Sequence, residues 1–130
     1  MDKSVNVLVV EDNPNLRKVL VNIVKKIGFA GISEAEDGQQ AWEMLEQDKI
    51  GLVLADWNMP RMNGLELLQK MRETNTGVSD IPFLMITAAD TKQSIMTAGK
   101  YGVDAYIIKP FSVNTISEKI EEAMSKRAAS

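Results

Sequence analysis

The chain of 130 residues contains no cysteine and no histidine, and these absences exclude more chemistry than any other feature of its composition. Without cysteine it can form no disulfide, no thiolate zinc site and no thiol nucleophile. Without histidine it has no imidazole base and no imidazole metal ligand. Any bound metal must therefore be a hard cation held by oxygen, and any nucleophile must be Ser, Thr, Tyr, Lys or a carboxylate.

Positive charge and long apolar runs are also scarce. Lys and Arg total 15 against 18 Asp and Glu, and this net charge of −3 disfavours nucleic acid as the main partner and favours a cationic ligand. No apolar run is long enough for a signal peptide or a spanning helix, so we expect no membrane partner and a cytoplasmic location. The composition, 45% hydrophobic and 25% charged, is that of an ordinary globular domain. We expect a single domain over residues 1–130, without an output domain.

Short apolar runs, too short for helices, recur along the chain. Nearly continuous aliphatic composition is typical of parallel strands that are buried on both faces. The predicted strands are Val5–Val10, Leu52–Ala55, Phe83–Ile86 and Ala105–Ile108. A weaker run, Ala30–Ser33, is predicted to be an edge strand.

Segments with helical spacing of apolar residues separate these runs. Asn13 before Pro14 has the pattern of a helix start, and Gly28 that of a helix end. Three pairs have the spacing of a capping box: Asp37 with Gln40, Asn63 with Glu66, and Asp90 with Gln93. About five β/α units result, which predicts a doubly wound α/β fold, with a parallel sheet covered by helices on both faces.

Polar residues gather at the ends of the predicted strands, where doubly wound sheets bind their ligands. Glu11 and Asp12 follow the first strand, Asp56 the third, Thr87 the fourth and Lys109 the fifth. Two carboxylates about 5 Å apart repel each other by roughly 3 kcal/mol at an effective dielectric near 20. Three carboxylates at one edge of the sheet therefore favour binding of a hard divalent cation, for which Mg²⁺ is the simplest choice.

Such a rim can bring a phosphoryl group to a carboxylate nucleophile. Asp56 is the better nucleophile because it stands alone in the centre of the sheet, while Glu11 and Asp12 form the metal side. Lys109 and Thr87 can neutralise the phosphoryl oxygens. Taken singly, an acidic pair is often only a solvated helix start, and Thr87 and Lys109 are ordinary surface or capping residues. Their occurrence at the ends of different strands favours a site.

Four ordered blocks carry a family resemblance over essentially the whole chain. They are VVEDN at 9–13, DWNMPRMNG at 56–64, ITA at 86–88 and YIIKPF at 106–111. These blocks resemble receiver domains of two-component response regulators, most closely the single-domain chemotaxis regulators. The resemblance implies a flavodoxin-like (βα)5 domain with strand order 2-1-3-4-5.

The resemblance also implies roles for the rim residues. Asp56 would accept phosphate from a phosphohistidine of a sensor histidine kinase. Mg²⁺ would be bound by Asp12, Asp56 and the backbone carbonyl of Asn58. Glu11, at a position where Asp is commoner, would reach the metal through water. Thr87 and Lys109 would hold the phosphoryl oxygens.

Further implications concern signalling. Tyr106 would turn inward when Thr87 moves, and Lys109–Pro110 would be a cis peptide. Asn58 and Ala89 would tune hydrolysis of the phosphoryl group, so the chain would be a self-dephosphorylating switch rather than a turnover enzyme. A monomer would dock to a protein target through its fourth helix, fifth strand and fifth helix. Residues 89–92 read Ala-Asp-Thr-Lys rather than the basic run of flagellar-motor regulators, which favours another target.

Three alternative functions stay open. A flavodoxin-like electron carrier is disfavoured because Glu11 and Asp12 would repel the flavin phosphate. A phosphatase of the haloacid dehalogenase type needs an acid two residues after the nucleophile, where this chain has Asn58. A degenerate receiver that acts as a phosphorylation-independent docking module should have lost an acidic or lysine position, and none is lost.

Overall fold

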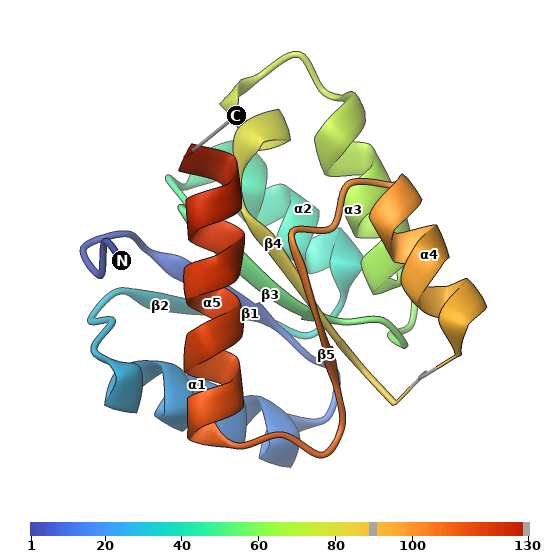
Figure 1. Cartoon of the computed structure of the whole chain (residues 1–130). Coiled ribbons are helices and arrows are strands. Elements are labelled where there is room, and N and C mark those ends of the chain that lie inside the picture. Colours follow the sequence, from blue (N-terminus) through green and yellow to red (C-terminus); the bar gives the residue numbers. More distant parts are fainter. Residues whose placement is uncertain (89–90, 129–130) are drawn as a thin grey trace.

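Five parallel strands form the centre of the molecule (Figure 1). The computed structural model describes residues 1–88 and 91–128. Its strands are β1 (Val7–Val10), β2 (Ile32–Ala35), β3 (Leu52–Asp56), β4 (Phe83–Thr87) and β5 (Ala105–Ile108). They pair in the order β2-β1-β3-β4-β5, all parallel. The doubly wound α/β fold and the order 2-1-3-4-5 are therefore confirmed.

Helices cover both faces of this sheet. They are α1 (Pro14–Ile27), α2 (Gly38–Gln47), α3 (Gly64–Glu73), α4 (Lys92–Lys100) and α5 (Val113–Ala128), with a 3₁₀ helix η1 (Gly77–Asp80). Figure 1 shows α1 and α5 in front of the sheet, and α2 and α3 behind it. No helix in the described part of the chain is long and apolar enough to cross a membrane.

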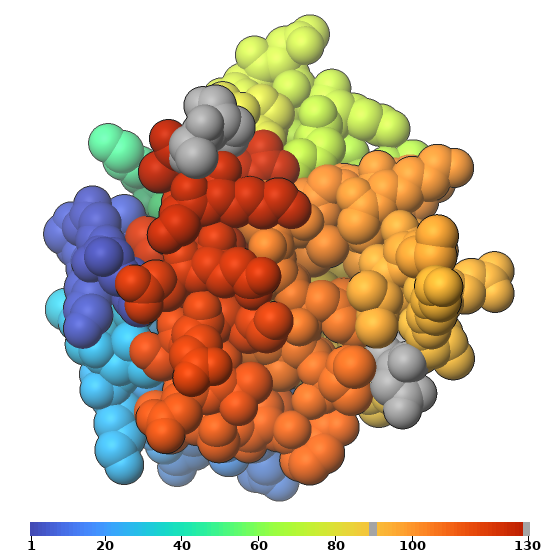
Figure 2. Space-filling model, viewed as in Figure 1, coloured from blue at the N-terminus to red at the C-terminus, as the bar shows by residue number. Residues whose placement is uncertain are grey.

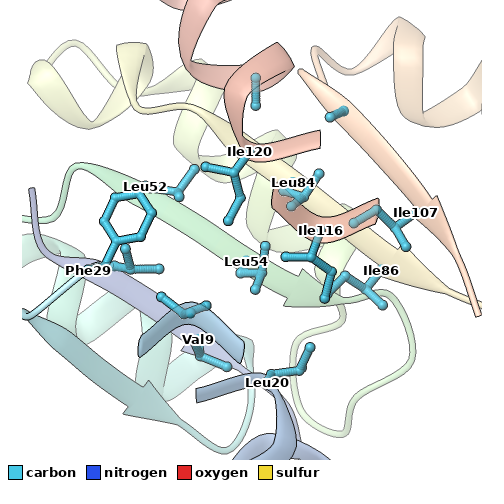
Figure 3. Packing of buried hydrophobic residues seen from close by; sticks show 14 of the residues in the cluster. Val9, Leu20, Phe29, Leu52, Leu54, Leu84, Ile86, Ile107, Ile116 and Ile120 are labelled. Atoms are coloured by element: carbon cyan, nitrogen blue, oxygen red, sulfur yellow. The ribbon is translucent and has the colours of Figure 1, made fainter. Parts of the chain in front are cut away.

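Two apolar clusters join the helices to the sheet, because successive residues of a strand point to opposite faces. In β1, Val9 packs in the cluster of α1 and α5, while Leu8 packs in the cluster of α2 and α3. Figure 3 shows the first cluster, in which Leu20, Ile116 and Ile120 meet the strand residues. Strands β1, β3 and β4 are buried along their whole length, as their continuous apolar sequences predict.

The predicted helix ends are largely confirmed. Asn13 caps α1 by accepting hydrogen bonds from the backbone of Asn15 and Leu16. Asp37 caps α2 by accepting from Gln40, and Asn63 and Glu66 bond reciprocally at the start of α3. Gly28 ends α1 with φ of 124°, in the region that favours glycine.

Several boundaries differ from the prediction: β1 begins at Val7 rather than Val5, and β3 and β4 each extend one residue further, to Asp56 and Thr87. The edge strand is Ile32–Ala35 rather than residues 30–33, because Phe29 turns into the core and the chain needs two exposed residues to reach the sheet. Helix α4 begins after Thr91, which accepts from the backbone of Ser94. Thr91 is thus the N-cap of α4. Asp90, which was predicted as the cap, lies outside the described residues.

Candidate functional site

Asp56 is the last residue of β3, with β1 on one side and β4 on the other. It is only 4% exposed. One carboxylate oxygen accepts a hydrogen bond from Lys109 Nζ at 2.7 Å, and the other accepts from the backbone N–H of Asn58 at 3.1 Å. A buried carboxylate needs such partners because burial removes its hydration. The structure thus brings the predicted nucleophile and the predicted lysine into direct contact.

Glu11 and Asp12 follow β1 but lie in different environments. Asp12 is exposed, whereas Glu11 is 1% exposed. Burial, followed by the proximity of the Asp56 and Asp12 carboxylates, raises the pKa of Glu11 to about 8. Its Oε2 accepts from the backbone of Asn13 at 3.1 Å, while its Oε1 has no hydrogen-bond partner among the described residues. Among residues 1–88 and 91–128, no Lys or Arg side chain is paired with the Glu11 carboxylate.

The three acidic side chains do not form one cage of metal ligands. Within residues 1–88 and 91–128, no three acidic side chains stand close enough together to hold a metal ion between them. Glu11 is buried and lies close enough to Asp56 and Asp12 for both to raise its pKa, while Asp12 is exposed and Asp56 is paired with Lys109. Mg²⁺ needs only one or two carboxylates beside carbonyl and water oxygens. The unpartnered buried oxygen of Glu11 and the all-oxygen donor set fit such a cation.

The raised pKa of Glu11 gives a first prediction. Between about pH 4.5 and pH 8 the folded state keeps a proton that the unfolded state has lost, so stability should fall as the pH rises through this range. Glu11→Gln mimics the protonated form. In metal-free buffer it should be more stable than the wild type by more than about 1 kcal/mol at pH 8, and close to it at pH 4.5.

Urea unfolding of both proteins across this pH range measures the difference. Glu121→Gln, on the exposed side of α5, is the matched control and should leave the pH dependence unchanged. A wild type and a Glu11→Gln variant with parallel pH profiles would show that Glu11 ionises normally.

Thr87 ends β4 beside the Asp56–Lys109 pair. It is fully buried, and its carbonyl accepts from the backbone N–H of Lys109 at 2.8 Å. The Lys109–Pro110 peptide bond is cis, as the family resemblance implies. The end of β4 and the start of the loop after β5 are thus tied together where the site lies.

Tyr106 lies on the same face of the sheet as Thr87. In the register of β4 and β5, Met85 is opposite Tyr106 and Thr87 is opposite Ile108, so Thr87 and Tyr106 share one face. The half-buried ring of Tyr106 meets Trp57 edge to face, with ring centroids 6.3 Å apart and an angle of 84°. The sequence did not predict this contact, which links the predicted switch residue to the neighbour of Asp56.

The sequence interpretation also missed three supports of the site. Arg17 donates to the carbonyl of Glu11 at 2.8 Å. Arg61 pairs with Asp37, which had been assigned only as a helix cap. A side chain at position 64 would collide with the carbonyl of Asp56, so only glycine fits there. Gly64 ends the DWNMPRMNG block, so the sequence does contain a signal for this close contact. The contacts of Arg17 and Arg61 have no such local pattern.

Comparison with known proteins decides the family. The sequence profile described as "Response regulator receiver domain" matches residues 7–121. The chain belongs to this family. This receiver is 43% identical over 115 residues to chemotaxis protein CheY1 of Helicobacter pylori strain J99, covering 88% of this chain and 92% of CheY1. It is 38% identical over 118 residues to a CheY homolog of Campylobacter jejuni strain 81-176, covering 90% of each chain.

A solved receiver domain has the same fold. It belongs to the sensor histidine kinase PA1611 of Pseudomonas aeruginosa PAO1 and is described with a magnesium ion coordinated in its active-site cleft. The likeness has a TM-score of 0.83 at 21% identity and covers 94% of this chain and 98% of that one. The predicted family is thus confirmed: this is a receiver domain of the CheY-like chemotaxis regulators, which implies phosphorylation-dependent signalling rather than metabolic catalysis.

Proposed function

We propose that this receiver takes a phosphoryl group from the phosphohistidine of a sensor histidine kinase onto Asp56. An oxygen of Asp56 forms the new O–P bond as the N–P bond of the phosphohistidine breaks, and the imidazole leaves. The observation that carries the proposal is the 2.7 Å contact between Lys109 Nζ and a carboxylate oxygen of Asp56 at the end of the central strand. It favours a working receiver over the degenerate docking module.

The surrounding groups have distinct roles in this proposal. Lys109 can move from the carboxylate to a phosphoryl oxygen, and the Thr87 hydroxyl can donate to another. Asp12, Asp56 and the Asn58 carbonyl would hold Mg²⁺, with Glu11 acting through water. When bound, Mg²⁺ would offset negative charge on the phosphoryl group. The magnesium ion described for the PA1611 receiver supports this assignment.

Substitution of Asp12 tests the proposed metal site. Mutation of a residue that only orients a metal ligand typically lowers metal affinity by about 10-fold to 100-fold. Asp12→Ala removes a proposed ligand itself, so it should weaken Mg²⁺ binding by at least about 100-fold. Fold stability should be preserved or raised, because one member of a repelling acidic group is removed. Fluorescence of Trp57 in a Trp42→Phe background, titrated with Mg²⁺, measures the affinity.

The control for this titration is Asp48→Ala. Asp48 is an exposed carboxylate at the end of α2, on the way to the start of β3 and so away from the strand ends that form the site. It should bind Mg²⁺ as the wild type does. An unchanged affinity in Asp12→Ala would remove Asp12 from the ligand set.

The signal would pass from Thr87 to Tyr106. If the Thr87 hydroxyl is drawn toward a phosphoryl oxygen, the Tyr106 ring can move inward on the face that both residues share. Its edge-to-face contact with Trp57 would then change, which gives the switch an optical signature. Asn58 and Ala89 would set the lifetime of the phosphoryl group; Ala89 lies outside the described residues.

Docking to a protein target would use α4, β5 and α5. Figure 2 looks onto α5 and α4, which share one side of the molecule. Three large apolar side chains are exposed on α4 and β5: Ile95 at 39%, Met96 at 63% and Ile108 at 39%. Exposed apolar side chains of this size can contribute to a docking surface. We favour a target other than the flagellar motor switch. We also predict that the protein is a monomer and that it lies in the cytoplasm.

A further inference from the structure

The loop between β3 and α3 carries Asn58, whose carbonyl belongs to the proposed metal site. The base of the loop is closed by a hydrogen bond from the Gly64 N–H to the Trp57 carbonyl at 2.8 Å. Near the end of the loop that leads into α3, Arg61 has φ of 65°. Residues other than Gly, Asn and Asp seldom adopt this left-handed backbone region. An arginine held there needs contacts that offset this cost.

Those contacts come from the start of α2. Arg61 Nε donates to Asp37 Oδ2 at 2.9 Å, and a terminal nitrogen of the same guanidinium contacts the same oxygen. The next residue on each side is also joined, because Gly38 N–H donates to the Met62 carbonyl at 2.9 Å. A side chain at position 38 would collide with Met62, so the two segments are in close backbone contact.

Asp37 is buried, and both of its carboxylate oxygens accept hydrogen bonds. It is 2% exposed, and its second oxygen accepts from the backbone N–H of Gln40 at 2.8 Å. Burial alone would raise the pKa of Asp37, but the hydrogen bond from Gln40 and the Arg61 guanidinium together hold it below its usual value. The carboxylate therefore stays charged and fixed, while the Arg61 side chain, 66% exposed, folds back onto it.

We propose that the Arg61–Asp37 pair is a clamp that positions the β3–α3 loop, and with it the Asn58 carbonyl, for the Mg²⁺ site. Arg61 and Asp37 are positioning residues, since neither contacts Asp56 in the described structure. The inference rests on the proposed function for its consequence, which is metal affinity. The order that the clamp imposes on the loop exists without metal and can be measured separately.

Two substitutions break the clamp with little other change. Asp37→Asn keeps an oxygen that can cap α2, because Asn is as good a cap as Asp, but removes the charge that faces Arg61. Arg61→Asn keeps a residue that tolerates the left-handed region but removes the guanidinium. Lys119→Asn is the control, because it breaks an exposed ion pair with Glu122 on α5.

Mg²⁺ titration of Trp57 fluorescence separates positioning from simple charge effects. A clamp predicts that both single variants bind Mg²⁺ about tenfold more weakly and that the double variant is no worse than either. A pure field effect predicts opposite signs: Arg61→Asn would strengthen and Asp37→Asn would weaken the binding of a cation, with near-wild-type affinity in the double variant. That pattern, or wild-type affinity in both single variants, would overturn the clamp.

Amide hydrogen exchange in EDTA supplies a readout that does not depend on metal or phosphorylation. In either clamp variant the amides of Gly38, Asn58 and Gly64 should exchange about tenfold faster, while those in the middle of α5 are unchanged. Unchanged exchange of these three amides would also overturn the clamp. A wild type that binds no Mg²⁺ but shows the predicted exchange differences would refute the proposed metal site and leave the clamp standing.

Discussion

Asp56→Asn should abolish phosphorylation of this receiver by acetyl phosphate. The substitution keeps the shape of the side chain at the end of β3 but removes the charged oxygen that attacks phosphorus. The wild type should gain one phosphoryl group in the presence of Mg²⁺ and none in EDTA. Intact-mass analysis of both proteins, followed by peptide mapping of the wild type, measures the result.

A control substitution tests whether the loss of phosphorylation is specific to Asp56. Asp48→Asn makes the same chemical change at an exposed carboxylate and should be labelled like the wild type. An adduct that persists in Asp56→Asn would move the nucleophile to Glu11 or Asp12. Labelling of the wild type that is equal with and without Mg²⁺ would refute the metal requirement while leaving Asp56 as the acceptor.

The strand ends were predictable because each depends on a local pattern. Strands β1, β3 and β4 are continuous apolar runs, and a parallel sheet brings their carboxyl ends to one edge whatever the details of packing. Asp56 and Thr87, expected just after their strands, are in fact the last strand residues. Their neighbours Lys109 and Glu11 reach the site because the register of the sheet places them there.

The electrostatic division of the site was not predictable in the same way. The sequence places Glu11, Asp12 and Asp56 on one rim, but it does not say which of them is covered. Burial makes Glu11 a weak acid, while exposure keeps Asp12 in contact with water and Lys109 offsets the charge of Asp56. The burial of a polar side chain just beyond a strand is set by the packing of several elements, so the residues next to it in the sequence do not reveal it.

Contacts between distant segments were missed for the same reason. Arg61 and Asp37 are 24 residues apart, and Arg72 and Asp104 are 32 apart. Neither pair has a spacing that repeats along a helix or a strand, so no periodic pattern marks it. The resemblance to receivers names the reacting residues, but it does not supply the ion pairs that hold this particular chain together.

A network of ion pairs surrounds Asp104 at the end of the sheet opposite the site. Asp104 directly precedes β5 and is 4% exposed. It accepts from Arg72 of α3 at 2.8 Å, from Arg127 of α5 at 2.7 Å and from the backbone N–H of Phe83 at 2.8 Å. Arg72 itself is largely buried and also donates to three backbone carbonyls, and burial lowers its pKa to about 10.

Asp104→Ala should therefore destabilise the protein by about 3 to 5 kcal/mol, the usual cost of removing one partner from a buried ion pair. Arg72 would keep its burial without its counter-charge, and the Phe83 N–H would lose its acceptor. Arg127→Ala should cost less, because the Arg127 side chain is 24% exposed and Asp104 would keep Arg72.

Urea unfolding measures the stability of both variants. Glu122→Ala, in the exposed Lys119–Glu122 pair, is a control that should change stability by less than about 1 kcal/mol. Because the network stands away from Asp56, the folded fraction of each variant should still be labelled by acetyl phosphate. A loss below about 1 kcal/mol in Asp104→Ala would mean that water replaces the carboxylate without cost.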